Sequence, residues 1–146
     1  MKNPFPLAVL LAALGCGDQP EPPAPPLHTP TLADFAGSWD LTVTFPEQGD
    51  TVHASLTGSE AGSDWVMINP GNQRVRMPTV SLKGDSMILV SEDFPAVVSP
   101  GARAQVRTAA VLREGVMEGK ILATFDLRDG SQQVRAGEIR AVRKRE

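Results

Sequence analysis

Residues 39–45, Trp-Asp-Leu-Thr-Val-Thr-Phe, decide the fold, because apolar and polar side chains alternate along them without a break. Alternation with a period of two is typical of a β-strand that buries one face and exposes the other. The apolar side chains of this strand are therefore predicted to face a core. The turn-forming residues 46–50 that follow contain proline and glycine and end the strand.

Seven further strands are predicted between turns rich in glycine, proline, asparagine and aspartate. They cover residues 52–57, 65–69, 74–83, 86–91, 104–113, 116–127 and 132–143. No amphipathic segment of helix length separates them, which favours an antiparallel meander. The sequence therefore predicts an all-β fold, an eight-stranded antiparallel up-and-down barrel, with a β-sandwich as the alternative. Closure is favoured because it removes exposed edges. The longest interruption, 92–103, is predicted to be a loop over one end of the domain.

Residues 31–39, Thr-Leu-Ala-Asp-Phe-Ala-Gly-Ser-Trp, resemble the short helical turn and Gly-x-Trp motif that open lipocalins and their relatives, the calycin superfamily. Residues 80–85 and 117–121 are similar to glycine-bearing strands of small bacterial lipocalin-like domains, and 141–143 to their ending. The resemblance implies a lipocalin-like barrel, with a short helical turn before the first strand and a basic side chain over the tryptophan.

The last strand of such a barrel runs antiparallel to the first, so the end of one lies beside the start of the other. Arg143 shares the parity of the inward positions of its strand and is predicted to cover Trp39, next to Gly37. A cation over an indole contributes about 0.5–2 kcal/mol. Arg140 is the second candidate, if a bulge at Gly137 shifts the register. These residues are expected to form a structural floor of the barrel and to have no catalytic role.

Several inward positions are small, so the interior is predicted to be either a modest apolar cavity or a tapered, packed core. The candidate ligand contacts are Leu41, Val43, Phe45, Leu56, Val106, Ala110, Ile121, Ala123 and Phe125. The first functional hypothesis is therefore the binding or carriage of a small apolar molecule. The alternative is a non-enzymatic structural or protein-interaction module with a filled barrel, whose loops contact a protein or surface polymer.

Enzyme chemistry is not expected. The sequence contains no nucleophile elbow, no histidine and glutamate at metal spacing and no phosphate-binding glycine loop, so we assign no catalytic residue, metal or cofactor. His53 belongs to the polar face of its strand, and His28 lies in a proline-rich segment. The net charge is −3, and the basic residues are spaced singly without neighbouring aromatics, which argues against nucleic acid as a partner.

The first residues predict an export signal, because Lys2 precedes an apolar run of about ten residues, 5–14, that is too short to span a membrane. Residues 13–16, Ala-Leu-Gly-Cys, resemble the lipobox of bacterial lipoprotein precursors, although the usual order of leucine and alanine is exchanged. The resemblance implies cleavage before Cys16 and acylation of that cysteine. The alternative is an ordinary signal peptide and a soluble secreted protein with one free thiol.

The chain is therefore divided into a lipoprotein signal peptide (1–15), a proline-rich tether (16–31) and a lipocalin-like β-barrel domain (32–146). The acyl anchor would make the membrane a partner and would place the protein in the bacterial cell envelope. Gly17, not aspartate, follows Cys16, which by resemblance to enteric lipoproteins favours the outer membrane, facing the periplasm. The sequence identifies no protein partner.

Overall fold

The computed structural model describes residues 17, 20–23 and 28–145. Its elements are α1 (Leu32–Phe35), β1 (Gly37–Phe45), β2 (Asp50–Gly58), β3 (Val66–Asn69), the 3₁₀ turn η1 (Pro70–Asn72), β4 (Gln73–Arg76), β5 (Thr79–Lys83), β6 (Ser86–Val90), β7 (Phe94–Pro95), β8 (Arg103–Arg113), β9 (Val116–Asp126) and β10 (Gln132–Arg143). The predicted all-β class and the helical turn before the first strand are both confirmed. The predicted signal peptide, Cys16 and parts of the tether lie outside the described residues.

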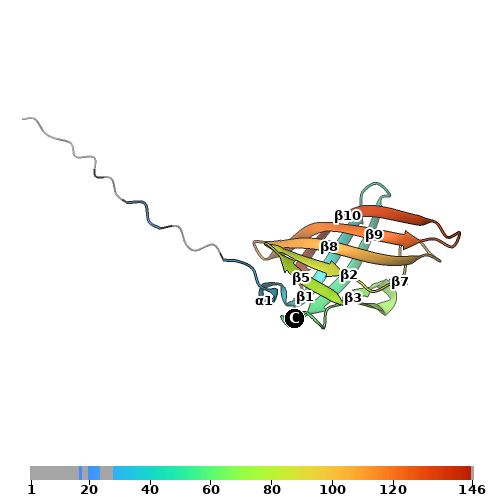
Figure 1. Ribbon diagram of the computed structural model, residues 1–146, viewed down its shortest axis with the longest axis horizontal. Helices are drawn as coiled ribbons and strands as arrows, with labels where there is room; N and C mark the ends of the chain where they lie inside the picture. The colour runs from blue at the N-terminus through green and yellow to red at the C-terminus, as the bar shows by residue number, and fades with distance from the viewer. Residues whose placement is uncertain (1–16, 18–19, 24–27, 146) are drawn as a thin grey trace, which may run out of the picture.

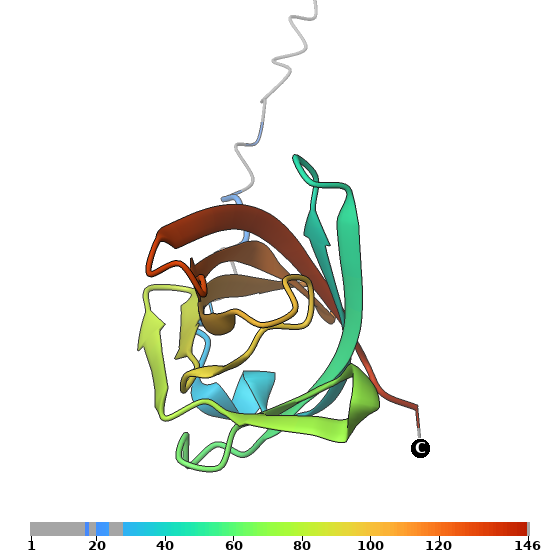
Figure 2. The ribbon, with the colours of Figure 1, turned by 90° about the vertical axis from the view of Figure 1, so that its right-hand side faces the viewer.

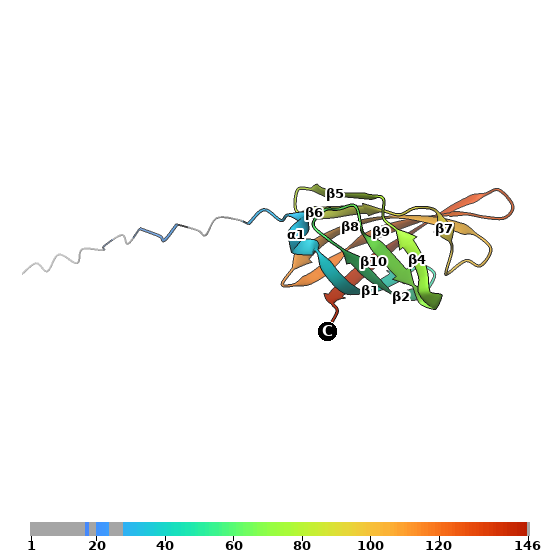
Figure 3. The same cartoon turned by 90° about the horizontal axis from the view of Figure 1, so that it is seen from below.

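All paired strands belong to one antiparallel sheet, with the order β4-β3-β2-β1-β10-β9-β8-β6-β5 and β7 added beside β8. The sheet curls strongly around a central space (Figure 2). Its first and last long strands pair as predicted, with Trp39 opposite Arg143 and Val43 opposite Ile139. The helix α1 and the C-terminal end lie at one end of the molecule and β7 lies at the other (Figures 1 and 3).

The strand prediction needs two corrections. The segment 74–83, predicted as one strand, is divided at Met77 and Pro78 into β4 and β5, which lie at opposite ends of the sheet path. Proline has no amide hydrogen to donate to a ladder, so the division falls where pairing is interrupted. The predicted loop 92–103 contains the short strand β7, which pairs with the start of β8. The described sheet therefore has ten strands, not eight.

No strand ladder joins β4 to β5 in the described part of the chain, so the sheet has a seam between its two ends. The residues just after β6 bridge this seam. Ser91 N–H donates to Val106 O on one side (2.9 Å), and Glu92 N–H donates to Arg76 O on the other (2.9 Å). This short segment thus connects β4 to β8 where β4 and β5 do not pair.

The core fills the concave side of the sheet. Alternate residues of each long strand are buried, as in β1, where Trp39, Leu41, Val43 and Phe45 all point inward. The largest fully buried side chains are Trp39, Trp65, Phe35, Leu56, Met87 and Met117. Among the described residues, no helix is long and apolar enough to cross a membrane.

Candidate functional site

One end of the barrel is closed by a floor built from α1, β1 and β10. The guanidinium carbon of Arg143 lies 4.3 Å from the ring centroid of Trp39, which is fully buried. Arg143 also donates to the backbone oxygens of Ala36 and Asp34, each at 2.7 Å. The indole Nε1 of Trp39 donates to Phe35 O at 2.8 Å. The predicted arrangement of Arg143 over Trp39 is therefore present, and it ties the helix to both strands.

The two other floor predictions have different outcomes. Gly37 adopts a φ of 123°, and a Cβ there would lie 2.8 Å from Nη1 of Arg143, so glycine is required for the arginine to reach the floor. Arg140 does not take part. It pairs with Thr42, points to the exposed face and lies 3.8 Å from Glu118. The second candidate is therefore wrong, because β10 keeps a regular two-residue alternation from Gly137 to Ala141.

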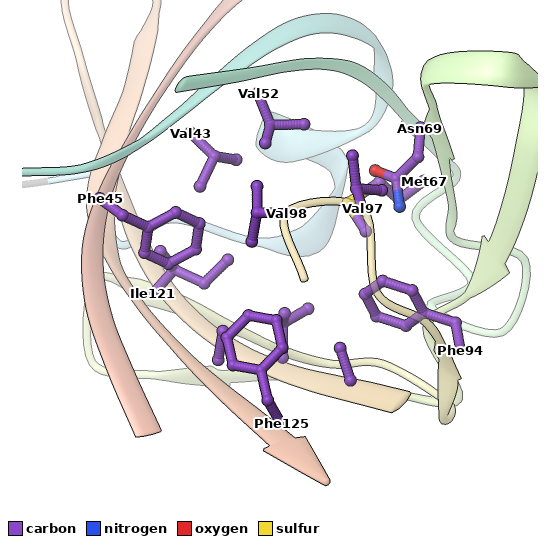
Figure 4. A pocket seen from close by; sticks show the side chains of 13 residues that line it. Val43, Phe45, Val52, Met67, Asn69, Phe94, Val97, Val98, Ile121 and Phe125 are labelled. Carbon is purple, nitrogen blue, oxygen red and sulfur yellow. The ribbon is translucent and has the colours of Figure 1, made fainter. Parts of the chain in front are cut away.

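The other end of the barrel contains an apolar cavity of about 50 Å³ (Figure 4). It is lined by Val43, Phe45, Val52, Met67, Asn69, Phe94, Val97, Val98, Ala104, Val106, Ile121, Ala123 and Phe125. Asn69 is the one polar residue in this set. Because Phe45 ends β1 and Trp39 lies near its start, the cavity and the floor occupy opposite ends of the same strand.

All nine predicted interior contacts are buried. Six of them line the cavity, namely Val43, Phe45, Val106, Ile121, Ala123 and Phe125. Leu41, Leu56 and Ala110 are packed in the core but do not border the cavity. The interior is therefore filled around these three residues and hollow at the end farther from the floor.

Sequence reasoning missed the part of the wall that the loop supplies. Phe94, Val97 and Val98 come from the segment predicted to be a loop, and the loop between β7 and β8 lies across the open end of the barrel (Figure 2). The signal was the run of apolar residues 94–98, since a solvated loop seldom carries five apolar side chains in succession. Asn69 and Met67 were missed because the sequence did not decide which face of the strand 65–69 points inward.

Arg135 lies beside the cavity, at an inward position of β10. Its side chain is 12% exposed, its guanidinium lies 4.9 Å from the ring centroid of Phe125, and its Nη1 is 3.2 Å from Asp50 Oδ2. The buried Nε has no hydrogen-bond partner among the described residues. The guanidinium thus packs on one ring of the cavity wall, and its charge is balanced by Asp50.

The titratable groups with shifted pKa values are exposed or half-buried and lie outside the cavity lining. Hydrogen bonds from the backbone and side chain of Ser59 lower the pKa of Asp64, and those from the hydroxyl and backbone of Ser131 lower the pKa of Asp129. A hydrogen bond from Lys120 lowers the pKa of Glu138. These are local turn and cross-strand contacts. They do not converge on one point.

The two histidines lie apart from each other and from the cavity. His53 is exposed on β2, with Nδ1 3.4 Å from Thr42 Oγ1, which is the outward position predicted for it. His28 is exposed and its Nε2 lies 3.0 Å from Asp34 Oδ2. Among the described residues, no three side chains of the histidine, cysteine, aspartate and glutamate types come close enough together to hold a metal ion.

No family model matches this chain, and neither the curated proteins nor the solved structures contain a match. Among the described residues, the apolar cavity and the loop over it are the features that bear on function.

Proposed function

We propose that the domain binds a small apolar molecule, or the end of a single acyl chain, in the cavity beneath the loop 96–101. The observation that carries this proposal is the cavity itself, whose wall is apolar at every residue but Asn69. Ligand sites are typically concave and mostly apolar, with a few polar groups that orient the guest. The Gly37 and Trp39 motif, with Arg143 over the indole, supports a lipocalin-like domain.

The volume limits the guest. An engineered apolar cavity of about 150 Å³ binds benzene, whereas this cavity measures about 50 Å³. The structure as it stands therefore suits a guest of a few heavy atoms or the terminal carbons of a chain that extends past the loop. A larger guest would require Val97 and Val98 to move, and Val97 is already 38% exposed.

The proposal is tested by nuclear magnetic resonance of the labelled protein under xenon pressure, since xenon enters dry apolar cavities. We expect saturable shifts at the amides of the cavity wall. The control variant is Ala123→Leu, which fills the cavity from a position that is 1% exposed, and which should abolish the shifts. Shifts that are absent from the wild type, or equal in the variant, would refute a usable cavity. Native mass spectrometry of protein from a lipid-containing host would then identify a retained guest.

The proposal also includes a cellular location. We propose a lipoprotein of the bacterial envelope, acylated at Cys16 and held at the outer membrane, facing the periplasm. Residues 28–31 lead into α1 at the floor end, so the loop over the cavity would lie at the end away from the tether (Figure 1). Intact mass analysis of the mature amino terminus tests this. A diacylglyceryl mass that disappears in Cys16→Ser is expected, and an unmodified thiol would contradict it.

A second candidate function is a non-enzymatic structural or protein-interaction module. It is favoured by the small size of the cavity and by the close packing of Trp39, Leu56, Met87 and Met117 in the rest of the interior. The xenon experiment separates the two, because a module with a filled barrel gives no saturable binding in either the wild type or Ala123→Leu.

A further inference from the structure

Asn69, at the end of β3, is the polar residue of an otherwise apolar cavity wall, and it is only 5% exposed. Burial of an amide is unfavourable unless its donor and acceptor both find partners. Its partners therefore indicate what the cavity is built to receive.

A chain of two hydrogen bonds fixes the orientation of the Asn69 amide. Gln73 Nε2 donates to the backbone oxygen of Pro95 at 2.8 Å. Since a carbonyl oxygen only accepts, this bond turns the Oε1 of Gln73 toward Asn69, whose Nδ2 donates to it at 2.9 Å. The –NH₂ group of Asn69 must therefore face Gln73, and its oxygen must face another direction.

The side-chain oxygen of Asn69 therefore faces the cavity. In Figure 4 the carboxamide oxygen of Asn69 points to the side of the cavity where Val97 and Val98 lie. Among the described residues, Asn69 Oδ1 accepts no hydrogen bond. The other twelve lining residues have hydrocarbon or thioether side chains, so none of these side chains can donate to it. A water molecule in this position would find no second partner among the side chains of the wall, whereas buried waters typically have two to four partners.

We propose that the guest of this cavity is a neutral, donor-bearing apolar molecule, of the alcohol or phenol class, whose hydroxyl group donates to Asn69 Oδ1. This inference rests on the proposed binding function and specifies the ligand class. A hydroxyl donates to this free acceptor on the cavity wall. An ether or hydrocarbon of equal size leaves it unpaired, and a carboxylate brings two more acceptors to it.

The test uses three probes of similar size: butan-1-ol, its isomer diethyl ether, and butanoate. Each is titrated into the labelled full domain, and the dissociation constant is taken from the shifts of cavity-wall amides. We expect the wild type to bind butan-1-ol about fivefold more tightly than diethyl ether, as one net hydrogen bond predicts. Butanoate should bind more weakly than either.

Two variants assign the selectivity to one atom. Asn69→Leu removes the acceptor and keeps an apolar wall, so the ratio of ether to alcohol dissociation constants should fall to about one, while ether still binds. Ile68→Val changes the opposite face of β3, outside the cavity lining, and should keep the wild-type ratio. If Asn69→Leu does not fold, the shift of the Asn69 side-chain carbonyl signal in the wild type on addition of butan-1-ol decides the question.

The failures are distinguishable. Equal binding of butan-1-ol and diethyl ether by the wild type would overturn the role of Asn69 and leave apolar binding intact. Tighter binding of butanoate would overturn it in favour of an anionic guest, whose cation would be Arg135 on the ring of the lining residue Phe125. Binding of none of the three, together with a negative xenon result, would overturn the proposed function itself.

Discussion

A single guanidinium organises the floor of the barrel. Arg143 packs its guanidinium on the indole of Trp39 and donates to two backbone oxygens, that of Asp34 in the one-turn helix α1 and that of Ala36 directly after it. The last carbonyls of a helix have no partner within it, so an arginine that binds them stabilises its end. The position is reached only because Gly37 has no Cβ. The side chains of this region therefore depend on one another, although they lie more than 100 positions apart in the chain.

Replacing Arg143 tests this dependence. Arg143→Ala should lower the free energy of unfolding by about 1–3 kcal/mol, since it removes two charge-assisted hydrogen bonds and a cation–π contact. Arg140→Ala is the matched control, because Arg140 lies on the same strand but on the outer face, where its 3.8 Å ion pair contributes less than about 0.5 kcal/mol. Urea denaturation measures both. Equal losses for the two variants would show that Arg143 has no special role.

At the scale of a single element, β9 depends on a close approach at Gly119. A Cβ at this position would meet Ala109 O and would lie 2.7 Å from the Cα of Ala110, both on the paired strand β8. Here the obstacle is backbone, which cannot move aside as the end of a flexible side chain can. The strands β8 and β9 thus approach each other more closely at this point than any side chain permits.

Gly119→Ala should therefore lower the free energy of unfolding by at least about 2 kcal/mol, in the range of overpacked cores. Leu122→Ala, three residues along β9 and 49% exposed on the outer face, should change it by less than about 0.5 kcal/mol. Thermal and urea unfolding of the two variants provide the comparison. A well-folded Gly119→Ala protein of wild-type stability would contradict the close approach.

The hydrogen bonds of Asp34 in α1 predict that the stability of the fold depends on pH. Hydrogen bonds from the backbone N–H of Thr31 and the side chain of His28 are the main causes that hold the pKa of Asp34 below its ordinary value of 3.8. A lowered folded-state pKa stabilises the fold above the ordinary value, and that stabilisation is lost as the pH falls through the lowered one. We expect the urea midpoint to drop below about pH 4 and the drop to be shallower in Asp34→Asn, measured between pH 7 and pH 2. Identical profiles would exclude this carboxylate as a contributor.

The strands and the loop over the cavity differ in how well the sequence predicts them. Alternation is a local property, so it predicted β1 and the inward residues correctly, and the antiparallel return of the last strand then placed Arg143 over Trp39. The division of 74–83 was foreshadowed by Pro78 but depends on which strands find partners, which is a tertiary matter. Phe94, Val97 and Val98 reach the cavity wall because their loop folds back over the end of the barrel. The periodicity of apolar residues along the sequence does not predict where a loop folds back.

At the scale of the whole molecule, the barrel has one weak line. The pairing of β1 with β10 extends from Trp39 to Thr44, whereas the seam at β4 is bridged by Glu92 and its neighbours. Glu92 contributes three contacts to Arg76: its backbone N–H donates to Arg76 O, its Oε1 accepts from Arg76 N–H at 3.0 Å, and its Oε2 lies 3.1 Å from Arg76 Nε. Opening of the barrel should therefore begin at this seam, next to the loop that covers the cavity.

Glu92→Ala isolates the seam, because it removes both carboxylate contacts and keeps the backbone bond. Amide hydrogen exchange should become severalfold faster at Arg76 and at position 92, while the amides of β1 and β10 keep their wild-type protection, since those strands retain a full ladder. Glu118→Ala, which removes an outer-face carboxylate 3.8 Å from Arg140, is the control and should leave the seam unchanged.

The support that Glu92 gives to the seam depends on pH. The hydrogen bond from the backbone N–H of Arg76 is the main cause that lowers the pKa of Glu92 below its ordinary value of 4.5. The carboxylate therefore supports the seam above pH 4.5 and ceases to do so as the pH falls through the lowered value. If exchange in Glu92→Ala rises equally over the whole sheet, the barrel opens as one unit and the loop has no separate route to expose the cavity.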